Sequence, residues 1–247
     1  MPAAVSTRTG PRHAGLDPRH GFLPPRIMVY HLPSADEAGW ETIPAVPLLT
    51  DLAGESIPRH EVRIQLAHDA QCLHLRADVR EARPVVHDEV APDHPAFWRQ
   101  DHIEFRLLPD VKADLEQVQF ILAASGRVFD SLGLWRRPDA AGLRFAGGPT
   151  AGGWQVTLSV PAARLGWRDG GASGCQAVGV LRGLVAYCRW TDGARDIACA
   201  TPAALGFPHA ERFAEFVFQP SIRGLSPQSA DEPFLHTRLE AVRMAPG

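Results

Sequence analysis

An aromatic residue and two carboxylates lie close together where a strand is expected to begin. Trp98 precedes Asp101 and Glu104 in the sequence FWRQDHIEF. The face of an indole ring can cover the C–H surface of a sugar, while carboxylates accept hydrogen bonds from its hydroxyls. The combination suits a sugar-binding site, but from these residues alone a tryptophan that only caps the core is the preferred interpretation.

The same two carboxylates do not make an acid and base pair. Asp101 and Glu104 are three residues apart, so within one strand they point to opposite faces and cannot flank one glycosidic bond. The sequence also lacks a GxSxG elbow, an HExxH helix, a phosphate-binding loop and a dinucleotide fingerprint. It therefore predicts a protein that is not an enzyme.

A polar loop before this strand raises the question of a metal site. Its titratable residues are His87, Asp88, Glu89, Asp93, His94, Asp101 and His102. Calcium prefers carboxylate and carbonyl oxygens, which makes Asp88, Glu89 and Asp93 the candidate ligands. No recognised ligand spacing is present, so a solvated polar loop is the preferred interpretation. No cofactor is predicted, with calcium as the one candidate.

Alternating apolar residues predict that this stretch is a β-meander. The first run places Ile103, Phe105 and Leu107 on one face and His102, Glu104 and Arg106 on the other. One face is expected to pack and the other to meet water or a neighbouring loop. A second run, VQFILAA, turns at Ser125 and Gly126 into VFD.

Further strands are predicted along the chain. They are IMVYHL after Arg26, a hairpin formed by EVRIQLAHD and CLHLRADVRE, WQVTLSV before Pro161, AVGVLRGLVAYCRW with Arg182 in it, and a last strand from Glu215 to Phe218. The Gly- and Pro-rich segment that contains Trp135 is expected to be irregular, and Trp40 is expected to close one end of the core. About nine or more short strands, with at most one or two short helical turns, predict an all-β fold, an antiparallel β-sandwich.

Composition excludes several classes of partner. The net charge is −3 and no block of like charges occurs, so nucleic acid and membrane surfaces are not expected partners. No apolar run reaches the ~20 residues that span a bilayer. No secretory signal is evident, which predicts a cytoplasmic protein as written, or a secreted or periplasmic one if the true start lies elsewhere. The four cysteines show no metal-ligand spacing.

The order of motifs resembles carbohydrate-binding module family 9 and the wider DOMON-like group of β-sandwich domains. The resemblance runs from Trp40 to Phe218 and rests on VRIQLAHDAQCLHLRADV, FWRQDHIEFRLLPD, VQFILAASGRVFD, GWQVTLSVPAARLG, VGVLRG and FPHAERFAEFVF. It implies a domain over residues 25–220, between a flexible tail over residues 1–24 and an extension over residues 221–247 that could add one edge strand.

The resemblance also implies a site. Similar domains hold sugars between two aromatic side chains, and many bind calcium structurally. Trp98 occupies the place of one aromatic residue, and Phe207 stands where a second, commonly Trp, is expected. Ile121 stands where sugar-binding members have an arginine, and Ala214 replaces an expected glycine.

The sequence thus predicts a non-catalytic domain that binds a mono- or oligosaccharide by aromatic stacking. Its expected ligand contacts are Trp98, Phe207, Arg182, Trp135, Asp101 and Glu104. The alternative is a structural or protein-interaction module with a degenerate sugar site, whose protein partner is unknown.

Overall fold

The computed structural model describes residues 25–32, 36–48, 61–92, 94–108, 117–132, 142–165, 181–191, 194–201 and 213–219. The strands of this part are β1 Arg26–His31, β2 Ala45–Val46, β3 Val62–His68, β4 Cys72–Val79, β5 His102–Leu108, β6 Val118–Ala123, β7 Val128–Leu132, β8 Arg144–Thr150, β9 Gly153–Pro161, β10 Arg182–Thr191, β11 Ala194–Cys199 and β12 Ala214–Phe218. The helices are α1 Glu37–Glu41 and the 3-10 helices η1 Pro95–Arg99 and η2 Ala162–Leu165.

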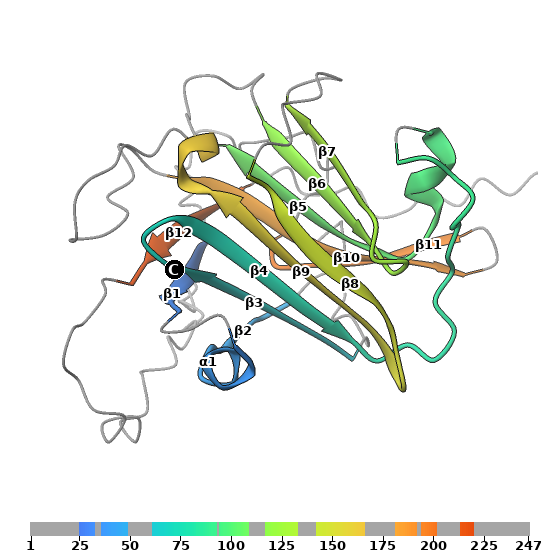
Figure 1. The fold of residues 1–247 in the computed structure, drawn as a ribbon, viewed down its shortest axis with the longest axis horizontal. Helices are drawn as coiled ribbons and strands as arrows, with labels where there is room; N and C mark the ends of the chain where they lie inside the picture. The colour runs from blue at the N-terminus through green and yellow to red at the C-terminus, as the bar shows by residue number, and fades with distance from the viewer. Residues whose placement is uncertain are drawn as a thin grey trace, which may run out of the picture.

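The strands form two layers joined through β1 (Figure 1). Hydrogen-bonded neighbours follow the order β7-β6-β5-β10-β12-β1-β3-β4-β9-β8, with β11 beside β10 and β2 beside β3. Most pairs are antiparallel, as the sequence predicts. The pairs of β1 with β12 and with β3 are parallel, which alternation within one strand cannot reveal, because pairing direction depends on distant segments.

The core lies between the layers and confirms the predicted inward faces. Alternate residues of β3, β4, β5 and β9 are buried there, and Phe105 stacks on Phe120 and on Phe216 with ring centroids 6.2 Å apart in both cases. Trp154 and Tyr187 meet 6.1 Å apart farther along. Hydrophobic alternation was sufficient to find these residues because each strand has one face on this core.

Three strands (β2, β8 and β11) and two helices (α1 and η1) occupy segments for which the sequence predicts no strand or helix. β8 carries Gly147, Gly148 and Pro149, residues with low strand propensity, and the ladder tolerates them because β8 pairs only with β9 at the end of the strand order. β11 is short and lies beside β10. α1 begins where the Asp36 carboxylate accepts a hydrogen bond from Gly39 N at 2.9 Å, which makes Asp36 its N-cap. With η1 and η2, the described helical turns number three rather than one or two.

Trp40 closes one end of the molecule, as predicted. It is 6% exposed and packs with Leu32, Ile43 and Ala67. Cys72, Cys188 and Cys199 are buried and form no disulfide among the described residues, and Cys175 lies outside those residues. In the described part of the chain, no helix has both the length and the apolar character to cross a membrane.

The turn between β6 and β7 lies directly on β8. Gly126 has φ of +79°, and a Cβ added there would lie 2.2 Å from the carbonyl oxygen of Gly147. The backbone of the β6–β7 turn in one layer therefore contacts the backbone of β8 in the other layer, with no side chain between them. This contact requires glycine on the turn, because a positive φ and a close backbone approach both exclude a Cβ.

His68 lies at the seam where β3 meets β1 and β12, and it predicts a pH dependence. His68 is 3% exposed, its Nε2 donates to Gln219 O at 2.8 Å, and burial lowers the pKa of His68 below 6.5; the titratable groups that face it are His31 and Asp69. Because the pKa of His68 is lower in the folded than in the unfolded protein, its contribution to the free energy of unfolding is fully present above pH 6.5. That contribution is lost as the pH falls through the pKa of the folded state. His68→Gln keeps a donor for Gln219 O. Urea unfolding at pH 8 and pH 5 should show the advantage of wild type over His68→Gln shrinking at pH 5; a constant difference would contradict the assignment.

Candidate functional site

The outer face of β5, the face turned away from the core, carries three polar side chains that the sequence singled out, namely His102, Glu104 and Arg106. On this face β5 pairs with β6 on one side and β10 on the other. Level by level across the three strands, the residues are Ala123, His102 and Cys188; Ile121, Glu104 and Ala186; and Gln119, Arg106 and Leu184. Sheet register therefore places β5 polar groups between two neighbouring strands that are mostly apolar at these levels.

Hydrogen bonds join Glu104, Arg106 and Gln119 into one network, which together with the adjacent His102 is called here the β5 strip. Glu104 Oε1 accepts from Arg106 Nε at 2.6 Å and from Gln119 Nε2 at 3.0 Å. Arg106 also donates to the Gln117 side chain at 3.4 Å. The strip therefore presents both acceptor and donor groups.

Apolar clusters flank the β5 strip on both sides. Toward β6 lie Phe97, Ile121, Ala123 and Phe129, with the half-buried Trp98 packed against them. The Trp98 ring meets Phe129 edge-on at 5.8 Å. Toward β10 and β11 lie Leu108, Leu184, Ala186, Cys188, Ile197, Cys199 and Phe213. The polar side chains of the β5 strip thus lie between two apolar clusters.

The face is more enclosed than a simple two-sided strand. His102 and Glu104 are 2% and 3% exposed, so of the two alternatives the sequence left open, contact with bulk water is wrong for these two residues. Burial lowers the pKa of His102 and raises the pKa of the Cys188 thiol well above its usual value. The ring and the thiol are therefore both neutral at pH 7, because a low-dielectric environment disfavours their charged forms.

Asp101 lies apart from Glu104, as the spacing predicts. Its Oδ1 accepts a hydrogen bond from Trp190 N at 2.6 Å, and burial raises the pKa of the carboxyl above its usual value. Glu81 and Arg189 are its charged neighbours. Asp101 therefore anchors the end of β10 and does not share a site with Glu104.

Of the other predicted site residues, Arg182 joins this face. It pairs with Leu108 in the β5–β10 ladder, so it shares the face of the β5 strip, and its buried Nε has no hydrogen-bond partner among the described residues. Ile121 lies directly opposite Glu104. Phe207 and Trp135 lie outside the described residues, so their predicted contacts stay predictions.

Two of the three candidate calcium ligands are described, and neither belongs to the strip. Asp88 and Glu89 are exposed on a turn, where the carbonyls of Asp88 and Val90 accept hydrogen bonds from Arg127, and Asp93 lies outside the described residues.

Sequence reasoning missed two members of the site. Gln119 and Cys188 carry no motif, and each acquires significance only through its neighbours across the sheet. The polar positions of HIEFRLL do indicate His102 and Arg106, because they alternate with core residues. Cys188 carries no comparable signal, since it lies 86 residues from its ladder partner His102.

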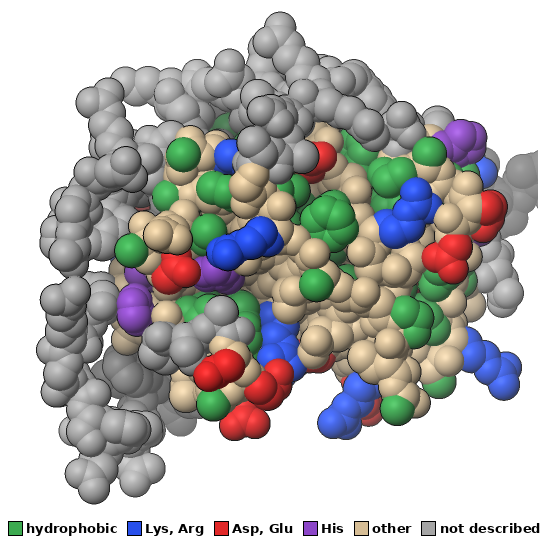
Figure 2. All heavy atoms as spheres, viewed as in Figure 1, with side chains coloured by type: hydrophobic (Ala, Val, Ile, Leu, Met, Phe, Trp, Pro, Cys, Tyr) green, Lys and Arg blue, Asp and Glu red, His purple; other side chains and the backbone are tan. Residues whose placement is uncertain are grey.

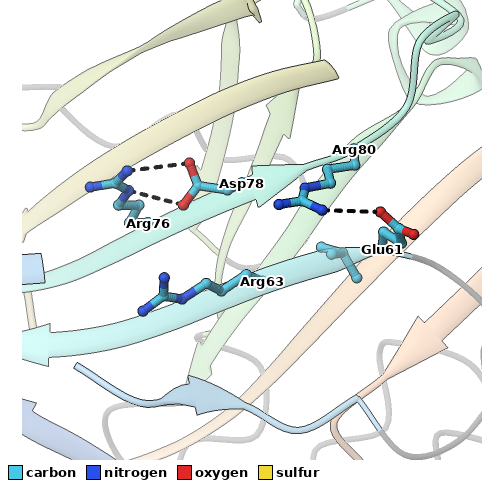
Figure 3. A pocket seen from close by; sticks show the side chains of 6 residues that line it. Glu61, Arg63, Arg76, Asp78 and Arg80 are labelled. Atoms are coloured by element: carbon cyan, nitrogen blue, oxygen red, sulfur yellow. Dashed lines mark hydrogen bonds and ion pairs between the residues drawn. The ribbon is translucent and has the colours of Figure 1, made fainter. Parts of the chain in front are cut away.

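The outer face of the opposite layer contains a cavity. A cavity of about 480 Å³ is lined by Glu61, Val62, Arg63, Arg76, Asp78 and Arg80 (Figure 3). Asp78 and Glu37 hold Arg76, and Glu61 lies 3.6 Å from Arg80. Figure 2, which looks at this layer, shows acidic and basic side chains interspersed. The charges of this cavity thus largely compensate one another.

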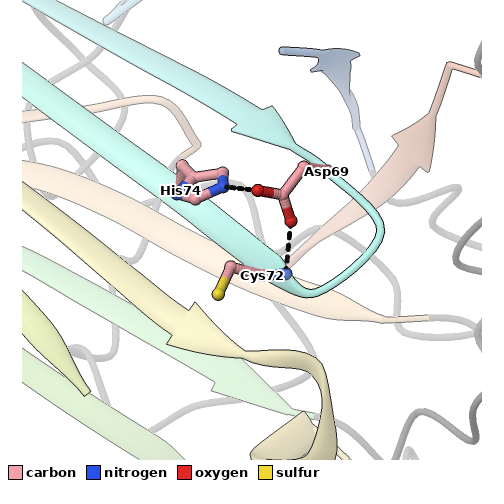
Figure 4. Close-up of side chains that lie close together, drawn as sticks. All are labelled: Asp69, Cys72 and His74. Atoms are coloured by element: carbon pink, nitrogen blue, oxygen red, sulfur yellow. Dashed lines mark hydrogen bonds and ion pairs between the residues drawn. The ribbon is translucent and has the colours of Figure 1, made fainter. Parts of the chain in front are cut away.

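A second cluster of potential metal ligands sits at the β3–β4 turn (Figure 4). Asp69 accepts hydrogen bonds from Gln71 N and Cys72 N at 2.7 Å each, and its other oxygen lies 3.0 Å from His74 Nε2. His74 Nδ1 meets Ser159 Oγ at 2.9 Å. Burial pushes the pKa of Asp69 upward, but these hydrogen bonds outweigh it and leave the pKa below its usual value. Because both His74 nitrogens are engaged, the network acts as a turn anchor.

Comparisons with known proteins bear on the fold. Protein-family models and curated proteins give no match. Among solved structures, a family 9 carbohydrate-binding module from Caldicellulosiruptor kristjanssonii in complex with glucose is 12% identical, with a TM-score of 0.56 over 82% of this chain and 100% of that one. A family 9 carbohydrate-binding module from the same organism in complex with cellotriose is also 12% identical. Its TM-score is 0.54 over 85% of this chain and 99% of that one.

A third solved structure is a Bacteroides uniformis protein described as a "putative carbohydrate-binding protein". It is 19% identical, with a TM-score of 0.57 over 79% of this chain and 99% of that one. At these identities the likeness concerns the fold, and it spans most of this chain. The chain therefore has the fold of family 9 carbohydrate-binding modules.

Proposed function

We propose that this chain is a non-catalytic carbohydrate-binding domain that holds a mono- or oligosaccharide on the outer face of β5. The β5 strip carries the proposal, since it sets a carboxylate, a guanidinium and an amide between two apolar clusters. A sugar offers the matching surface, with hydroxyls for the polar groups and C–H faces for the apolar ones. The solved structures with glucose and cellotriose share the fold and support this class of ligand.

Each residue of the site has a distinct role in the proposal. Trp98 supplies a stacking surface beside the strip, Glu104 accepts hydrogen bonds from hydroxyls, and Gln119 donates. Arg182 extends the donor set along the same face. Glu104 is 3% exposed, so a sugar reaches it only after the side chains that shield it move aside, whereas the half-buried Trp98 is accessible first.

The test compares two aromatic substitutions. Trp98→Ala removes the proposed stacking surface, and Phe145→Ala removes a ring that is 50% exposed on β8. Wild type and Phe145→Ala should bind a sugar in calorimetric and thermal-shift screens with glucose, cellotriose and other saccharides, with and without calcium. Trp98→Ala should bind more than tenfold more weakly, because a central tryptophan is worth about 2 kcal/mol.

Two results would contradict the proposal. One is a folded wild-type protein that binds no saccharide in the screen. The other is an unchanged affinity in Trp98→Ala, which would place the sugar elsewhere.

Ile121 favours a second candidate function, a structural or protein-interaction module with a degenerate site. It sets an apolar side chain opposite Glu104, where sugar-binding relatives are expected to offer an arginine. Absence of any saccharide hit together with one defined protein that co-purifies with the chain would support this alternative.

A further inference from the structure

Three side chains of different chemistry converge on the outer face of β5 and β10. Ligand atoms of His102, Glu104 and Cys188 all lie within 4.8 Å of one another. His102 and Glu104 are two residues apart on one strand and so share a face, and Cys188 is directly opposite His102 on β10. The ladder itself therefore holds the three groups together, which a flexible loop would not.

The donor set is specific in its chemistry. An imidazole nitrogen, a thiolate sulfur and a carboxylate oxygen are the three kinds of protein ligand that zinc takes. Calcium and magnesium prefer oxygen alone, so the sulfur and nitrogen select against them. Three protein ligands also match the zinc sites that keep a fourth position open.

Neighbouring groups already orient two of the ligands. His102 Nδ1 lies 2.7 Å from Gln100 O. A carbonyl can only accept, so Nδ1 carries the proton and Nε2 keeps its lone pair. Glu104 uses Oε1 for Arg106 and Gln119, which leaves Oε2 for another partner. Metal-binding histidines and carboxylates are commonly held by such outer contacts.

We propose that His102 Nε2, Glu104 Oε2 and Cys188 Sγ bind a zinc ion. The Cys188 thiol loses its proton to solvent as the Zn–S bond forms, so one proton is released for each ion bound. The thiolate and the carboxylate then balance the two charges of the metal, while Arg106 stays paired with the other oxygen of Glu104. The inference does not depend on the proposed function, although it shares Glu104 with it.

The cluster at the β3–β4 turn is a useful contrast. There His74 has both nitrogens engaged, and the guanidinium of Arg144 lies 3.6 Å from Cys72 Sγ, where its charge opposes a cation. That cluster therefore lacks the free nitrogen lone pair that His102 offers.

The experiment uses cobalt(II) as a visible substitute for zinc, in the absence of sugar. Cobalt added to the full chain, or present during its refolding, should give a sulfur-to-cobalt charge-transfer band that zinc abolishes by displacement. Cys188→Ala and His102→Gln should each lose the band or bind at least about tenfold more weakly. Zinc should raise the melting temperature of wild type and leave that of Cys188→Ala unchanged.

Matched cysteine controls separate this site from others. Cys199→Ala removes a buried thiol from the neighbouring strand β11, and Cys72→Ala removes the thiol of the β3–β4 cluster. Both should keep the cobalt band. Wild type without a band, or a band that persists in Cys188→Ala, overturns the proposal; if Cys188→Ala fails to fold, His102→Gln decides in the same way. Because no sugar is present, a failed zinc test leaves the carbohydrate proposal standing, and a failed saccharide screen leaves this one.

Discussion

Replacing Phe105 by alanine should lower the free energy of unfolding by about 3–5 kcal/mol. The ring is 0% exposed and lies between Phe120 and Phe216, which come from different strands of the same layer. Its removal loses apolar burial and leaves a cavity that two stacked neighbours cannot easily fill. Urea denaturation at pH 8, followed by tryptophan fluorescence, measures the change.

Phe145→Ala is the matched control for this prediction. It removes the same ring from β8, where half of the side chain is already exposed, so its effect should stay within about 0.5 kcal/mol. If the two variants lost similar amounts of unfolding free energy, Phe105 would not lie in the core between the two layers.

Gly126→Ala should destabilise the protein by about 2 kcal/mol or more. A side chain at positive φ costs about 1–3 kcal/mol, and the added Cβ would also lie 2.2 Å from Gly147 O, so β8 must move. Thermal and urea unfolding measure the loss. Hydrogen exchange should in addition show weaker protection in β8, since the turn holds that strand against the other layer.

Gly152→Ala provides the comparison at a second turn. Nothing lies within 4 Å of a Cβ added at Gly152, and its backbone does not require glycine. The change should be neutral or stabilising by up to about 1 kcal/mol, because alanine restricts the unfolded chain. If both glycine variants behave alike, the contact between the β6–β7 turn and β8 is not what holds the two layers at this end.

Much of the fold and part of the site could be predicted from single strands. The alternation of Val62, Ile64 and Leu66, and of Ile103, Phe105 and Leu107, identified strands and their buried faces. Each such strand has one face on a continuous core, so apolar residues recur at every second position of its own sequence. β8 was not predicted because Gly147, Gly148 and Pro149 interrupt the alternation of apolar and polar residues. Backbone pairing with β9 makes this segment a strand despite its low strand propensity.

The position of the candidate site follows the same division. The spacing of Asp101 and Glu104 was enough to separate them, and the structure finds Asp101 bound to Trp190 N and Glu104 in the β5 strip. Nothing local to Cys188 or Gln119 indicated that either would lie beside β5.

The sequence by itself determined the all-β character of this protein, the buried faces of most strands and the separation of Asp101 from Glu104, because side-chain alternation is a property of a single strand. Only the tertiary structure decided which strands are neighbours. It set β1 parallel to both β12 and β3, Cys188 opposite His102, and Ile121 opposite Glu104. These contacts depend on pairing between segments far apart in the chain, which no periodicity within one segment encodes.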